Sequence, residues 1–278
     1  MTDLILAICA SAAISLIMRL SSDRVTNNVS MLAVNYLTCL VLAAFFTGEE
    51  GFLPRDPALP RALWMGGLHG VLYLASFVTF QCSVRRSGVV LSAIFMKLGL
   101  LVPMVLSVFL FGEIPGIAQS FGFLLAVGAI IAINFEKDAA ASASALGLVT
   151  LLVLGGTADA MSKVFEELGP GHLSGQFLLY TFLTAFLLCL GLVAVKKQRF
   201  TGWELLFGFA IGIPNFFSAR FLLGALESLK AVVVYPTYSV ATILLITLAG
   251  TVFFRERLRR HQWAALGIIL PAMVLLNL

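Results

Sequence analysis

Three ionisable residues lie inside long apolar stretches of this sequence, where a charge is costly to keep. Lys97 and Asp159 lie well inside their stretches, and Arg220 lies closer to the end of its own. If these stretches cross a bilayer, each charge near the centre costs at least about 2.5–3.5 kcal/mol, so its retention indicates function. We predict that Lys97 and Arg220 bind a carboxylate or phosphate of a substrate, and that Asp159 serves as a coupling group.

Each of the three charges also has a structural interpretation. Lys97 could bond a helix carbonyl or an acid on another helix. Arg220 could extend toward the nearby membrane edge, or pair with Glu227 two helical turns later. Lys163 follows Asp159 by four residues, which is the spacing of an ion pair within one helix. Both interpretations of each residue stay open at this point.

Polar and aromatic residues recur at helical spacing on other apolar stretches. His69 and Tyr73 share one helix face, Tyr235 and Tyr238 lie close together on another stretch, and Asn35 lies on a third. Rings supply contact area and hydroxyl groups supply hydrogen bonds, so these residues are predicted to line a substrate cavity. The alternative is hydrogen bonding between helices, worth about 0.6 kcal/mol per pair in membranes.

The composition places most of the chain in lipid. Of the 278 residues, 60% are hydrophobic and 12% are charged, against about 25% charged in a soluble globule. The basic residues, which give a pI near 9.0, form short clusters between apolar stretches, which is typical of membrane loops and not of nucleic-acid binding. Ten stretches are about long enough to span a bilayer as helices: 4–20, 31–47, 61–84, 88–111, 116–134, 146–165, 173–195, 203–226, 231–254 and 263–278.

These stretches lack the alternating pattern of a membrane barrel, so we predict an all-α membrane protein with ten transmembrane helices. The first stretch begins almost at Met1 without a basic segment before it, so it is expected to be a retained helix and not a signal peptide. Loop Lys and Arg residues predict that the first loop is cytoplasmic and both termini are outside. The expected location is the inner (plasma) membrane, multi-pass.

The second half of the sequence repeats the first. Glu256 follows Glu113, and Gln262 follows Gln119, by the same 143 positions. We therefore predict two five-helix repeats, residues 1–137 and 138–278. Since five is odd, the second repeat crosses the membrane in the opposite sense, as in transporters that bind substrate between inverted repeats.

The chain resembles the drug/metabolite transporter superfamily, in particular its EamA-type ten-helix members. The resemblance rests on Gly112-Glu113 after the fourth stretch with Gln119 following, and on Arg255-Glu256 after the ninth. The usual basic residue after Gly-Glu is missing in the first turn, and Arg255 replaces Gly in the second. The resemblance implies a small-molecule carrier, often an exporter, that works without ATP.

The predicted function is secondary active transport of a small anionic or zwitterionic metabolite, an amino acid or related carboxylate, by alternating access and in the export direction. The alternatives are a hydrophobic-cation or multidrug exporter, a lipid-modifying membrane enzyme, and a sensor without transport. The sequence carries no nucleotide-binding loop, metal-ligand cluster or nucleophile motif, so no enzyme activity, cofactor or metal is expected. The expected partners are a small-molecule substrate and the lipid bilayer, without nucleic acid, and a homodimer is left open.

Overall fold

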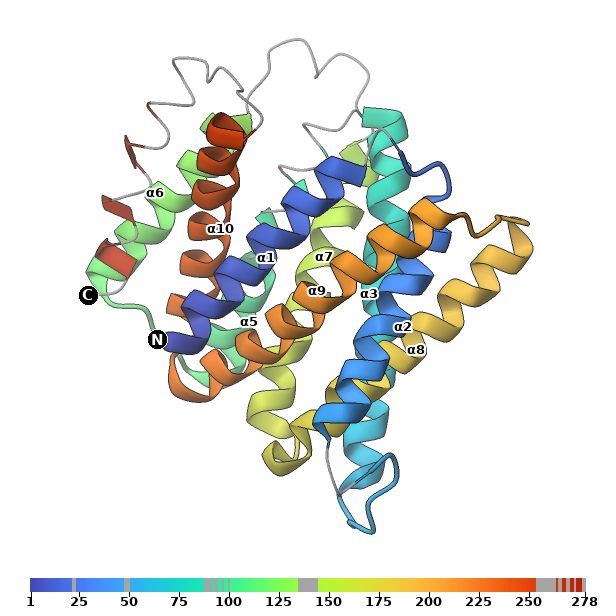
Figure 1. Ribbon diagram of the computed structural model, residues 1–278. Coiled ribbons are helices and arrows are strands. Elements are labelled where there is room, and N and C mark those ends of the chain that lie inside the picture. Colours follow the sequence, from blue (N-terminus) through green and yellow to red (C-terminus); the bar gives the residue numbers. More distant parts are fainter. Residues whose placement is uncertain are drawn as a thin grey trace. The chain divides into compact units, whose positions relative to one another are not determined.

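Every regular element in the described part of the chain is a helix. The computed structural model describes residues 1–21, 24–47, 51–87, 92, 95–96, 98–99, 101–134, 145–253, 264, 267–268, 271–272 and 274–276. Figure 1 shows its helices. They are α1 (Thr2–Ser21), α2 (Asn28–Phe46), α3 (Leu59–Ser87), α5 (Leu101–Phe111), α6 (Ile117–Asn134), α7 (Ala145–Leu168), the 3-10 turn η3 (Gly171–Leu173), α8 (Ser174–Val195), α9 (Gly202–Ser228) and α10 (Ala231–Phe253).

The predicted all-α membrane class is confirmed for these described residues. Seven of their helices are long and apolar enough to cross a bilayer, namely α1, α2, α3, α7, α8, α9 and α10. The helices α5 and α6 include shorter apolar segments. The ten-helix count and the inverted repeat stay predictions, and the turn at 254–263 with Glu256 and Gln262 lies outside the described residues.

The helices form two compact units, and each unit draws on both halves of the sequence. Unit 2 contains Thr2–Leu74 and Val164–Glu227, and therefore α1, α2, the first part of α3, the end of α7, η3, α8 and most of α9. Unit 1 contains Met1, Ala75–Lys163 and Ser228–Leu278, and therefore the rest of α3, α5, α6, most of α7 and α10. The candidate functional site lies within unit 2.

Glycine pairs let helices approach closely inside unit 2. A Cβ atom on Gly66 or Gly70 of α3 would lie 2.6 or 2.5 Å from a backbone oxygen of α8. A Cβ atom on Gly208 or Gly212 of α9 would lie 2.6 or 2.8 Å from a backbone oxygen of α2. Both spacings follow the small-xxx-small pattern of membrane helices. These contacts hold α3 against α8 and α9 against α2.

Gly70→Ala should therefore destabilise the protein, while Gly67→Ala should not. The new Cβ at position 70 would lie 2.5 Å from the Thr181 carbonyl oxygen, and overpacking of this kind costs roughly 1–3 kcal/mol. At position 67 the nearest atom is 3.8 Å away, which is ordinary contact. Unfolding of both variants in the same detergent checks the prediction, and equal stability of the two would contradict it.

The carboxylate of Glu204 joins two turns of unit 2. Its Oε2 accepts a hydrogen bond from the Thr201 backbone N–H at 2.9 Å, the spacing of a capping box at the start of α9. Its Oε1 accepts hydrogen bonds from the Thr26 and Asn27 backbone N–H groups at 3.3 and 3.1 Å. Glu204 is 1% exposed, and these bonds fix the start of α9 to the turn between α1 and α2.

Unit 1 contains a buried ion pair centred on the turn after α5. Gly112 has a φ of +67°, a conformation that favours glycine, and Glu113 follows it. The Glu113 carboxylate lies 2.9 Å from Lys163 Nζ on α7, with the two side chains 11% and 4% exposed. Its second oxygen accepts a hydrogen bond from the Val232 backbone N–H at 3.3 Å. Glu113 thus connects the α5–α6 turn to α7 and to the N-terminus of α10.

Candidate functional site

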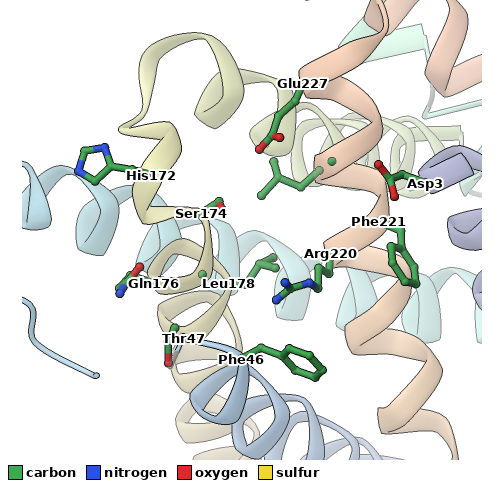
Figure 2. Close-up of a pocket in the computed structure, with 13 residues that line it drawn as sticks. Asp3, Phe46, Thr47, His172, Ser174, Gln176, Leu178, Arg220, Phe221 and Glu227 are labelled. Carbon is green, nitrogen blue, oxygen red and sulfur yellow. The ribbon is translucent and has the colours of Figure 1, made fainter. Parts of the chain in front are cut away.

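A cavity of about 520 Å³ lies at one end of unit 2. It is formed by the start of α1, the end of α2, η3 with the start of α8, and the last turns of α9. Figure 2 shows its lining side chains, with Arg220, Phe221 and Glu227 of α9 on one side and His172, Ser174 and Gln176 on the other. A volume of this size accommodates a small metabolite.

The packing of unit 2 explains why these helix ends meet. The helix α9 runs along α2 in the same direction, because Gly208 lies against Met31 and Gly212 against Asn35. The end of α2 lies against the start of α8, since a Cβ on Gly175 would lie 3.0 Å from the Thr47 methyl group. The last turns of α9 therefore reach the point where α2 ends and α8 begins.

Arg220 is the predicted substrate-binding residue that lines this cavity. It is exposed, and its guanidinium carbon lies 4.7 Å from the centroid of the Phe46 ring, a cation–π contact. Within the described residues the structure has no ion pair between Arg220 and Glu227, so the pairing considered above is not found. The planar N–H groups of Arg220 are available for a carboxylate or phosphate.

Two carboxylates complete the charged lining of the cavity. Asp3 comes from the start of α1, and its Oδ2 lies 3.3 Å from the position of a Cβ on Gly224, so it lies close to α9. Glu227 comes from the last turn of α9 and is exposed. The cavity therefore presents one cation and two anions, together with the hydroxyl groups of Thr47 and Ser174.

A loop contact supports the rim of the cavity at His172. His172 Nε2 lies 2.9 Å from Asp56 Oδ2, and Tyr180 donates its hydroxyl to the Phe52 carbonyl of the same loop. The Ala58 N–H bond and His172 lower the pKa of Asp56 below its ordinary value. A carboxylate whose pKa is lowered by folding stabilises the folded protein at pH values above its pKa in the unfolded chain. This stabilisation is lost as the pH falls through the lower pKa of the folded protein. The loop contact is thus expected to persist at neutral pH.

The predicted residues Asn35, His69 and Tyr73 also belong to unit 2, but they do not line the cavity. Asn35 Oδ1 accepts a hydrogen bond from Asn215 Nδ2 at 3.2 Å. The ring of His69 packs on Tyr73, with centroids 4.7 Å apart, and stacks on Phe177 at 5.2 Å. Asn35 and His69 are each 2% exposed. The structure places these residues in helix–helix contacts, which is the alternative that the sequence left open.

The remaining predicted residues lie elsewhere. Tyr235, Tyr238 and Asp159 belong to unit 1, where the Tyr235 hydroxyl donates to the Asp159 backbone carbonyl at 2.8 Å. Lys163, considered above as a partner of Asp159, forms its 2.9 Å ion pair with Glu113. Lys97 lies outside the described residues.

Several cavity residues were not predicted from the sequence, because the charges expected to indicate function were those inside apolar stretches. Asp3, Thr47, Ser174 and Gln176 all lie at the beginning or end of a predicted helix. These residues could have been predicted together by looking for polar residues at those ends of the transmembrane helices that are expected on the same side of the membrane. The structure adds that four such ends converge on a single cavity.

Comparisons with known proteins agree with this architecture. The EamA-like transporter family matches residues 2–135. An uncharacterized protein of Haemophilus influenzae is 24% identical over 97% of this chain and 94% of its own length. A crystal structure of 16% identity covers 100% of this chain and 98% of its own, with a TM-score of 0.76, and shows a shared fold. On this match, which covers just under half of the chain, residues 2–135 resemble the EamA-like transporter family.

Proposed function

We propose that the protein is a secondary transporter of a small zwitterionic or anionic metabolite, such as an amino acid or a related carboxylate. The observation that carries this proposal is the placement of Arg220 in the 520 Å³ cavity, without an ion-pair partner among the described residues. A substrate carboxylate would bind the Arg220 guanidinium, and a substrate ammonium group would lie near Asp3 and Glu227. The family supports transport as the general activity.

The proposed mechanism is alternating access between two repeats, residues 1–137 and 138–278, in the inner membrane and in the export direction. Matched contacts support the repeat: α3 packs on α8 through Gly66 and Gly70, and α9 packs on α2 through Gly208 and Gly212. In the predicted repeat α9 corresponds to α3, and α8 to α2. The cavity would then be the substrate pathway open toward one membrane face.

Uptake into liposomes tests the proposal. Purified protein in vesicles is supplied with radiolabelled amino acids or organic acids under an imposed solute or proton gradient. Candidate solutes come from a thermal-shift screen, because a ligand that binds the folded state stabilises it. Accumulation that requires the protein and stops when the gradient collapses supports the proposal. Binding without accumulation under any gradient would instead identify a sensor.

The two carboxylates favour hydrophobic-cation export as a second candidate. Asp3 and Glu227 line the cavity, and neither forms an ion pair within the described residues. A lipophilic cation would pair with one of them and stack on Phe46 or Phe221. Under this function Asp3→Asn or Glu227→Gln, whichever removes the carboxylate that pairs with the cation, would abolish transport, and Arg220→Ala would leave it unchanged or raise it. Arg220→Ala therefore separates the two candidates, because the first candidate predicts that this variant weakens transport.

A further inference from the structure

A second cavity lies in unit 1, between the end of α3 and the start of α7, with a volume of about 200 Å³. The helix α3 contributes Thr79, Cys82 and Arg86, which recur every three to four residues and share one helix face. The helix α7 contributes Leu146 and Thr150, which are also four residues apart. The cavity is therefore a groove that runs along two neighbouring helices.

The floor of this groove is a close contact between the two helices. Ser83 is 3% exposed, and its hydroxyl donates to the Gly147 carbonyl at 3.4 Å. The Thr150 hydroxyl donates to the Leu146 carbonyl of its own helix at 2.8 Å. The donor hydrogens of both hydroxyl groups are thus used within the protein, and the walls of the groove offer mainly apolar surface.

One end of the groove carries a positive charge. Arg86 lies at the end of α3, is exposed, and forms no ion pair within the described residues. The neighbouring sequence carries a second basic residue, Arg85. Basic residues predict that this end of α3 faces the cytoplasm, where anionic lipids attract juxtamembrane Lys and Arg. A ligand of the groove would therefore be apolar along its length and anionic at the end that meets Arg86.

We propose that this groove binds an anionic phospholipid, with the phosphate on the Arg86 guanidinium and one acyl chain along the face formed by Thr79, Cys82 and Leu146. A phospholipid carries its anionic phosphate at the membrane surface and its apolar acyl chains toward the membrane interior, which matches the order of Arg86 and the apolar walls. A free phosphate would leave the apolar walls uncovered, and a zwitterionic lipid would carry a second charge of the same sign as Arg86. The site is separate from the proposed transport cavity of unit 2.

Lipid-dependent stability of the purified protein tests this proposal. Dioleoyl phosphatidylglycerol and dioleoyl phosphatidylcholine are titrated separately into the detergent-solubilised protein, and the thermal unfolding midpoint is followed. Phosphatidylglycerol should raise the midpoint more than phosphatidylcholine at equal concentration. Arg86→Ala should weaken the apparent affinity for phosphatidylglycerol roughly tenfold, about 1.4 kcal/mol.

Two further variants test the charge and the groove separately. Arg61→Ala removes the same side chain from the opposite end of α3, where its guanidinium contacts the Leu168 carbonyl at 3.5 Å, and it should leave the preference for phosphatidylglycerol intact. Thr150→Trp fills the groove but keeps Arg86, and it should weaken phosphatidylglycerol binding as well. If Arg86→Ala fails to fold, the Thr150→Trp variant and the comparison of the two lipids on the unaltered protein still test whether the groove binds phosphatidylglycerol.

Three results would overturn the proposal. Equal stabilisation by the two lipids would show that the headgroup charge is not recognised. Equal stabilisation by glycerol phosphate, which has no acyl chains, would show that the apolar walls are not used. A loss of lipid preference in Arg61→Ala as large as in Arg86→Ala would show a general effect of charge at the membrane surface.

Discussion

Replacing Arg220 with alanine should weaken the apparent affinity for a carboxylate substrate by roughly 10- to 150-fold. This range corresponds to the loss of hydrogen bonds to a charged group, about 1.5–3 kcal/mol. Arg220 lines the 520 Å³ cavity and contacts the Phe46 ring. Arg220→Lys should restore only part of the affinity, because lysine keeps the charge but loses the bidentate fork. Concentration-dependent uptake into liposomes measures both variants.

Arg199→Ala is the matched control for this prediction. Arg199 also belongs to unit 2 and is exposed, but it lies between α8 and α9 and outside the cavity lining. Its replacement should leave uptake unchanged. An Arg220→Ala protein that is folded and transports every accepted solute with unaltered affinity would disprove the anion site.

The two cavity carboxylates separate zwitterionic from purely anionic substrates. Asp3→Asn and Glu227→Gln should weaken uptake of a zwitterion, because each removes a charge that would face its ammonium group. The same variants should leave uptake of a simple carboxylate unchanged or improve it. Equal losses for both solute classes would show that these residues act on the fold and not on substrate charge.

Glu113→Gln should destabilise the protein by about 3–5 kcal/mol, the usual cost of removing one partner from a buried ion pair. Lys163 is 4% exposed at its side chain, so its charge would remain buried beside the substituted residue. The glutamine keeps an oxygen that can accept the Val232 N–H bond. The loss of stability therefore reports the charge of Glu113 separately from the hydrogen bond that this residue accepts at the N-terminus of α10. Chemical unfolding in a fixed detergent measures the change.

A double-mutant cycle provides the control for the ion pair. Lys163→Met alone should be destabilising, but Glu113→Gln combined with Lys163→Met should recover most of the loss, because neither charge of this pair is then buried without the other. Additive losses in the double variant would show that the 2.9 Å contact carries no coupling energy. Glu113 would then stabilise the protein only through the Val232 bond.

The fold was more predictable from sequence than the site, and particular residues show why. Gly66, Gly70, Gly208 and Gly212 share a spacing that predicts close helix approach, and each lies against a neighbouring backbone. This spacing lies within a single helix, so it can be recognised in the sequence without knowing which helix packs against it. His69 shows the limit, since a polar residue on a helix face can meet either a cavity or another helix.

The amino-acid sequence by itself determined that this chain is a helical membrane protein, because 60% hydrophobic residues in long stretches can be accommodated only in lipid. It also singled out Arg220 and Glu113, because charge and turn chemistry are visible at single positions. The tertiary structure decided what those residues meet. Arg220 lies in a cavity made by the ends of four helices, and Glu113 pairs with Lys163, far away in the sequence. Such contacts depend on how the helices pack, and no local pattern of residues encodes that packing.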